Sequence, residues 1–159
     1  MSDRNKALTI WALAVVTGAL GAWLLLRDRP PELTAERLSA ARALWQSSGP
    51  HSYTAVVATE AAGLERQVYT VRVRDSQAQG DAATPGQQSY AVDSLFKLLE
   101  RELDLARDPT AYGAPQGASA YLFASFDGRL GYPHLFRRIV GAGGRYAELR
   151  VLKLESTPE

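Results

Sequence analysis

The chain is organised around the stretch at residues 7–26, ALTIWALAVVTGALGAWLLL, which contains twenty residues and no charge. Charged residues bound it on both sides, within the tail at 1–6 and again at Arg27 and Arg29. A helix rises about 1.5 Å per residue, so the stretch reaches about 30 Å, the thickness of the hydrocarbon core of a bilayer. We therefore predict a short N-terminal tail at 1–6 and a single transmembrane helix at 7–26.

Three other interpretations fit the composition of this stretch less well. A cleaved signal peptide has an apolar core of about 7 to 15 residues followed by a small-residue cleavage site, whereas this core runs directly into leucines at 24–26. A lipoprotein anchor needs a cysteine, and the chain has none. A buried helix of a soluble protein would show a polar stripe, but Thr9 and Thr17 are the polar side chains here. An uncleaved anchor is the prediction that remains.

Small residues line one face of the predicted span. Ala14, Gly18 and Ala22 fall at positions i, i+4 and i+8, and Gly21 lies beside them. Small residues at this spacing let a second helix approach closely in a membrane. The face is either a packing interface for a partner helix or the ordinary abundance of glycine and alanine in such spans, and the sequence leaves both open.

The orientation of the span rests on two opposing signals. Lysine and arginine are more frequent after the stretch than before it, which places the large domain inside the cell. A very short tail before an apolar segment is instead the usual form of an anchor that exports the domain on its C-terminal side. We expect an exported domain.

The domain after the span is electrically neutral. Lys and Arg total 18 in the chain, of which two precede the span, and Asp and Glu total 17, of which one precedes it. Residues 27–159 therefore carry sixteen of each sign. Without a basic excess, binding to nucleic acid is not expected, because its affinity depends on neutralising phosphates.

The periodicity of residues 27–159 predicts an α+β domain behind a short linker. Residues 27–32 (RDRPPE) form the linker, and 33–159 form the extramembrane domain, in which Thr34 caps a first helix that buries Trp45. An apolar face at 92–106 predicts a second helix. Alternation predicts strands at 52–59, 66–74, 120–127, 134–140 and 145–155, with a loop at 75–88 and a central position for 120–127, which is apolar on both faces. We expect one antiparallel sheet of about five strands with both helices on one face.

Two motifs, Val-Asp-x-Leu-Phe at 92–96 and Leu-Gly-Tyr-Pro at 130–133, follow Trp45 and a strand that opens near Tyr53. This order resembles a small bacterial domain family of unknown function, over roughly residues 37–152. The resemblance implies export, since such domains are generally exported or lipid-anchored, and it implies no activity. The chain departs from the family in lacking its cysteine pair, in placing Ala91 where a cap threonine is expected, and in a glycine-rich insertion at 141–144.

Residues suited to catalysis or metal binding do not form a recognisable pattern. His51 and His134 have no acidic or cysteine partner at ligand spacing. Glu100, Glu102 and Asp104 are expected on a solvated helix face. We predict no enzyme activity, no cofactor and no metal.

The preferred hypothesis is a non-enzymatic, single-pass accessory subunit of a bacterial membrane protein complex, for example an energy-converting assembly. It would reside in the inner membrane with a periplasmic or extracellular domain, and its partners would be the lipid bilayer and other transmembrane helices or subunits. The alternative is a membrane-tethered module that binds a small ligand or peptide between the sheet and the helix at 92–106. The residues expected to line that site are Tyr121, Phe123, Tyr132 and Phe136.

Overall fold

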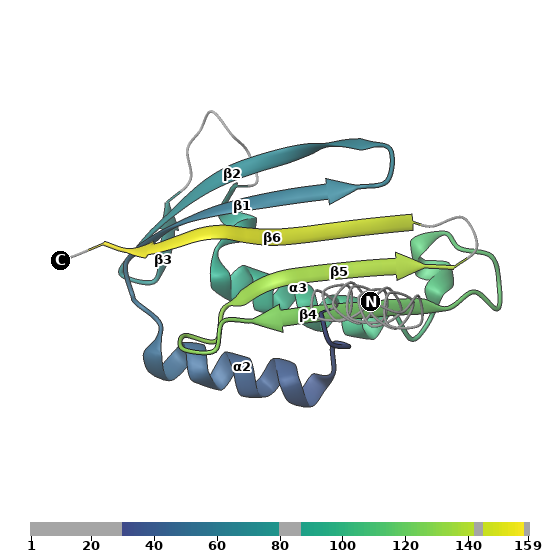
Figure 1. Ribbon diagram of the computed structural model, residues 1–159, viewed down its shortest axis with the longest axis horizontal. Coiled ribbons are helices and arrows are strands. Elements are labelled where there is room, and N and C mark those ends of the chain that lie inside the picture. The colour runs from purple at the N-terminus through teal and green to yellow at the C-terminus, as the bar shows by residue number, and fades with distance from the viewer. Residues whose placement is uncertain (1–29, 80–86, 142–144, 158–159) are drawn as a thin grey trace, which may run out of the picture. The chain divides into compact units, whose positions relative to one another are not determined.

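The computed structural model describes residues 30–79, 87–141 and 145–157. Within these ranges the chain forms a six-stranded antiparallel sheet in the order β3-β2-β1-β6-β5-β4, accompanied by two α-helices (Figure 1). The strands are β1 (Tyr53–Ala61), β2 (Leu64–Arg74), β3 (Gln77–Gln79), β4 (Ala120–Phe126), β5 (Pro133–Val140) and β6 (Arg145–Ser156). The helices are α2 (Ala35–Ser48) and α3 (Val92–Leu105), with 3-10 turns at η1 (Gln87–Tyr90) and η2 (Pro109–Tyr112).

Strands β1 and β2 form the antiparallel hairpin that the alternation at 66–74 predicts. Val71 and Val73 are buried, and the arginines that alternate with them are exposed on the other face. Because successive side chains of a strand point to opposite faces, this alternation gives the hairpin one apolar and one polar face. The turn contains Gly63 at φ 79°, a conformation that glycine adopts without a steric penalty.

Strand β6 joins the two halves of the sheet. It pairs antiparallel with β1 on one side and with β5 on the other. The last strand of the chain is therefore inserted between the first hairpin and the β4–β5 pair. The predicted central position of residues 120–127 is wrong, because β4 is an edge strand.

The outer edge of β4 is covered by the segment that precedes α2. The backbone N–H of Leu33 donates to Leu122 (2.9 Å), and that of Ala124 donates to Pro31 (3.0 Å). Glu32 completes the contact as a bridge to Phe123. Unpaired edge strands expose backbone donors and acceptors to other chains. Pro31 and Glu32 of the predicted linker therefore belong to the folded unit, which begins at Pro31.

Helix α3 lies across one face of the sheet (Figure 1). It confirms the amphipathic pattern at 92–106: Val92, Leu95, Phe96 and Leu99 are fully buried, and Leu103 is partly buried against the same core. Ala91, at its N-cap, has no side-chain acceptor. The hydroxyl of Tyr53 takes that role and accepts from the N–H of Val92 at 2.9 Å. Burial of this hydroxyl raises the pKa of Tyr53 to about 12, against the opposing effect of the bond from Val92.

Helix α2 begins as predicted, because the hydroxyl of Thr34 accepts from the backbone N–H of Arg37 at 3.3 Å. The helix buries Trp45, whose ring meets Tyr53 and Tyr132 edge-on at 5.4 and 6.4 Å. The prediction that Trp45 anchors the core is confirmed. The apolar residues of α2, α3 and one sheet face form one core: Leu33, Leu38, Ala41, Trp45, Tyr53, Ala55, Val57, Val71, Val73, Ala91, Val92, Leu95, Phe96, Leu99, Leu122, Ala124, Phe136, Leu149 and Val151.

The predicted fold, a membrane helix followed by a sheet of about five strands, is wrong. The described sheet has six strands, because β3 lies within the region expected to be a loop at 75–88. In Figure 1, α2 lies beyond the β4 edge of the sheet and α3 lies behind the sheet. Neither of these 14-residue helices of the described chain is long and apolar enough to cross a membrane. The predicted span at 7–26 lies outside the described residues.

Candidate functional site

The structure does not bring the four predicted ligand-lining residues together. Phe136 is buried in the core, 3% exposed, and Tyr132 packs against Trp45. Tyr121 and Phe123 alternate with the buried residues of β4 and so point away from α3. The predicted helix-packing residues Ala14, Gly18, Gly21 and Ala22 lie outside the described residues.

A cavity of about 310 Å³ lies between the β1–β2 hairpin, the neighbouring strands β5 and β6, and helix α3. We call it the hairpin cavity. Its apolar walls come from Leu64 of β2, Leu98 of α3, Phe136 of β5 and Leu149 of β6. This volume lies within the range of sites that bind small ligands or single side chains. The site is thus in the predicted layer between sheet and helix, with Phe136 as the one predicted residue among those that line it.

The first polar group of the cavity centres on Glu102 of α3. Arg138 of β5 donates from one Nη to both carboxylate oxygens of Glu102 at 2.8 Å. The hydroxyl of Tyr112 donates to the same carboxylate at 2.9 Å, and the guanidinium of Arg138 lies 4.4 Å from the centre of its ring. Burial, followed by the bond to Glu102, raises the pKa of Tyr112. Glu102 is therefore held by charge-assisted hydrogen bonds and is not the freely solvated residue that we predicted.

The second polar group centres on Glu148 of β6. It accepts from Arg137 at 2.8 and 3.1 Å, from the hydroxyl of Tyr146 at 2.5 Å, and from Arg150 at 3.0 Å. Burial alone would raise the pKa of Glu148, but the bonds from Tyr146 and Arg137 and the nearby positive charges lower it overall. The bond to Glu148 also raises the pKa of Arg137.

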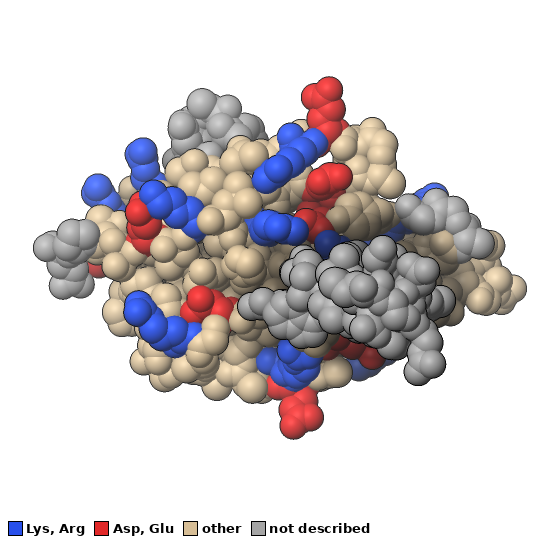
Figure 2. All heavy atoms as spheres, in the orientation of Figure 1, with Lys and Arg blue, Asp and Glu red and all other residues tan. Residues whose placement is uncertain are grey.

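Arg137 and Arg138 are adjacent on β5 and therefore point to opposite faces of the sheet. Each pairs with one glutamate and lies over the ring of one tyrosine. Figure 2 shows the face of the molecule opposite α3, where basic and acidic side chains are interspersed. Because donors already occupy Glu102 and Glu148, the two groups hold β5 against α3 and against β6 beside the cavity.

One side chain that lines the cavity, Arg138, carries a buried donor without a partner in the described part of the chain. The Nε of Arg138 is buried and has no hydrogen-bond acceptor among the residues that the structure describes. A buried donor without an acceptor is uncommon in folded proteins. A ligand in the hairpin cavity that carries an acceptor would lie beside the side chain that bears this donor.

Neither polar group has a signature in the sequence, because each depends on tertiary pairing. Glu102 and Arg138 are separated by 36 residues, and the register between α3 and β5 that joins them has no sequence signature. The Arg137-Arg138 pair could have indicated a buried ion pair, because one of two adjacent arginines in a predicted strand must face the helices.

The histidines take no part in either polar group. His51 lies 3.3 Å from the hydroxyl of Ser76 through its Nδ1, and His134 is exposed on β5. In the described ranges, no three acidic, histidine or cysteine side chains are grouped so that they could hold a metal ion.

The described residues form a domain that is mostly sheet, with two helices, one closed sheet edge and a cavity beneath its first hairpin. No family model, curated protein or solved structure matches the chain.

Proposed function

We propose that the protein is a non-enzymatic, single-pass accessory subunit of a membrane protein complex, with its domain exported and held at the membrane surface. The uncharged stretch at 7–26 supplies the anchor, and its small residues, centred on Gly18, supply the contact with a neighbouring span. The domain then covers an extramembrane surface of the same complex.

The observation that carries this proposal is the hydrogen-bonded start of the domain. Pro31 and Leu33 pair with β4, and the side chain of Leu33 is only 4% exposed. Four residues, 27–30, separate the apolar stretch from this pairing. A fully extended chain advances at most about 3.6 Å per residue, so the step from Leu26 to Pro31 cannot exceed about 18 Å. A subunit with so short a connection would contact one complex with both its span and its domain.

Purification from native membranes in a mild detergent tests this function. We expect the full chain to migrate in a large complex on a native gel, and Gly18→Ile to release it because a β-branched side chain on the packing face prevents close approach. Leu20→Ile, two positions away and thus on the opposite side of the helix, is the matched control and should leave the complex intact. Recovery of the wild-type chain only as a free monomer contradicts the proposal.

A second candidate function is a membrane-tethered module that binds a small ligand or a peptide. The hairpin cavity and the unpaired Nε of Arg138 favour it.

A further inference from the structure

The two edges of the sheet differ in how far another segment pairs with them. The edge at β4 is closed by backbone pairing with Pro31 and Leu33. At the other edge, β3 pairs with β2 only at residues 72–74. Residues 64–71 of β2 therefore have no strand partner on their outer side among the described residues. Such an edge presents backbone donors and acceptors whose natural complement is another extended chain.

The hairpin cavity adjoins this open edge. Leu64, Glu65 and Gln67 of β2 all contribute to its lining. Tyr69, two residues further along the same face, stacks on Tyr90 of η1 with ring centres 4.6 Å apart. Since side chains of a strand alternate between faces, every second side chain of a strand added to β2 would point toward the α3 side, where the cavity lies.

The cavity suits an aliphatic side chain. Leu64 is 71% exposed at the rim, and Leu98, Phe136 and Leu149 provide apolar walls further in. An aliphatic group that covers this surface is stabilised by the apolar area that both partners remove from water. Main-chain pairing with β2 would supply affinity for any extended segment, and the cavity would supply the choice of side chain.

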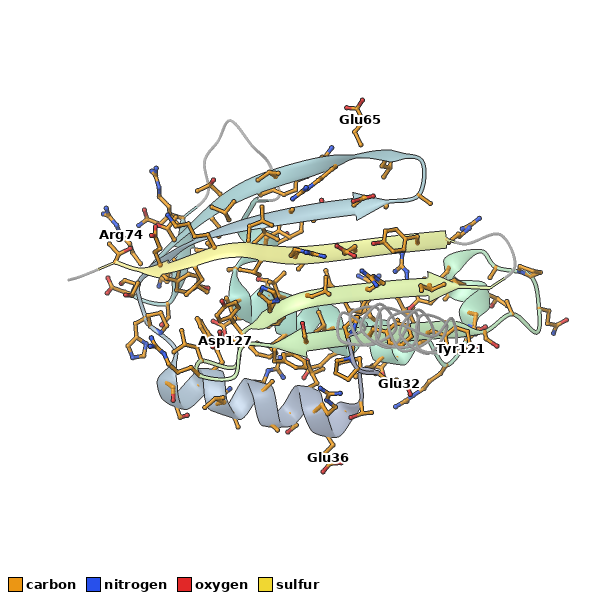
Figure 3. The ribbon with its side chains drawn as sticks, in the orientation of Figure 1. Glu32, Glu36, Glu65, Arg74, Tyr121 and Asp127 are labelled. Atoms are coloured by element: carbon orange, nitrogen blue, oxygen red, sulfur yellow. The ribbon has the colours of Figure 1, made fainter. Side chains whose placement is uncertain are left out.

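Negative charge at the same edge favours a basic side chain on an added strand. Figure 3 shows the side chain of Glu65 extending outward from β2, beyond the edge of the sheet. Glu60, from the paired strand β1, is exposed near the same end of the hairpin. Neither glutamate forms an ion pair with a described residue. A lysine or arginine on an added strand would therefore meet an unneutralised carboxylate.

We propose that the outer edge of β2 at 64–71 binds an extended peptide segment of a partner protein. The segment adds as a further strand, places an aliphatic side chain in the hairpin cavity, and sets a basic side chain beside Glu65. This inference rests on the proposed function, because it names the chemistry by which the domain binds a subunit of its complex.

The test uses the full chain in detergent micelles and the capped heptapeptide Lys-Thr-Leu-Thr-Leu-Thr-Lys as probe. We expect binding in the submillimolar range, with slower amide hydrogen exchange at residues 64–71 when the peptide is present. The control peptide has the same sequence with its alternate backbone amides N-methylated, which removes donors and keeps every side chain. It should bind at least about tenfold more weakly, because several main-chain hydrogen bonds are lost together.

Charge reversal at the edge provides the protein-side test. We expect Glu65→Lys to weaken binding about fivefold or more, since attraction to a basic side chain becomes repulsion. Glu36→Lys is the matched control, because Glu36 is also exposed and lies on α2, away from the hairpin (Figure 3). It should bind as wild type does. Circular dichroism checks that both variants are folded.

Four outcomes overturn the inference: no binding at millimolar peptide, equal binding of the N-methylated peptide, equal effects of the two charge reversals, or protection at 64–71 in a self-associated chain without peptide, which would make a second copy the occupant. These outcomes are independent of the membrane test, because the chain can belong to a membrane complex without binding this peptide. If the wild-type chain is recovered from membranes only as a free monomer and still binds the peptide, the proposed function is contradicted and the peptide-binding edge is not.

Discussion

At the scale of single residues, Tyr53 links the sheet to the start of α3. Its ring is buried against Trp45, and its hydroxyl is the acceptor for the N–H of Val92. A helix leaves its first N–H groups without intrahelical partners, and Ala91 has no side chain that could accept one. The hydroxyl of Tyr53, which lies on strand β1, thus provides the acceptor that an N-cap side chain would otherwise provide.

Tyr53→Phe tests this role. We expect the free energy of unfolding to fall by about 1–2 kcal/mol, because the buried N–H of Val92 loses its acceptor while the ring and its packing remain. Urea unfolding followed by circular dichroism measures the change. Tyr121→Phe removes the hydroxyl of an exposed tyrosine and should change stability by no more than about 0.5 kcal/mol. Equal effects of the two changes would argue against the capping role.

At the scale of elements, the turn before β5 passes very close to helix α2. Gly131 has a φ of 82°, and a Cβ placed on it would lie 2.3 Å from the backbone oxygen of Ala41. The same turn is held by Asp127, whose carboxylate accepts from the N–H groups of Arg129 and Leu130 at 3.0 and 2.7 Å. The Leu-Gly-Tyr-Pro motif therefore acts as a packing device between a turn and a helix.

We expect Gly131→Ala to lower the free energy of unfolding by about 2–4 kcal/mol, since the new Cβ meets both an unfavourable φ and the helix backbone. Gly128→Ala, in the same turn, is the matched control, because nothing lies within 4 Å of a Cβ there. Thermal and urea unfolding of both variants provide the measurement. A small effect at Gly131 would mean that α2 moves aside at little cost.

At the scale of the whole molecule, ionic groups on both faces of the sheet tie its second half together. Glu148 joins β6 to β5 through Arg137, and Glu102 joins α3 to β5 through Arg138. The two groups hold β5, β6 and α3 together beside the hairpin cavity. Protonation of Glu148 therefore affects the stability of the complete fold.

Acid titration of stability tests the Glu148 group. Its pKa is lower in the folded protein than the value of about 4.3 expected for an unfolded glutamate. A lowered pKa adds stability that is present above the unfolded value and is lost as the pH falls through the folded one. We therefore expect the stability difference between wild type and Glu148→Gln to be largest near pH 7 and to shrink below about pH 4. Glu155→Gln, at an exposed residue of the same strand, is the control. A difference at Glu148 that stays constant from pH 7 to pH 3 would contradict this account.

The local elements could be predicted from the sequence alone. The valine and arginine alternation at 66–74 predicted a strand of the first hairpin, the apolar spacing at 92–106 predicted α3, and Thr34 predicted the start of α2. These predictions are confirmed because each depends on residues that are close together in the sequence. The apolar stretch at 7–26 and its small-residue face remain predictions of the sequence alone.

The strand order and the candidate site, by contrast, could not be predicted without the three-dimensional fold. Residues 120–127 were predicted to form a central strand because both faces are apolar, yet β4 is an edge covered by residues 31–33. Likewise, no local pattern places Arg138 against Glu102 or the hairpin cavity beside β2. The physical reason is that strand order and ion pairs between distant segments arise from packing the whole chain around one core, whereas periodicity reports only which face of each element is buried.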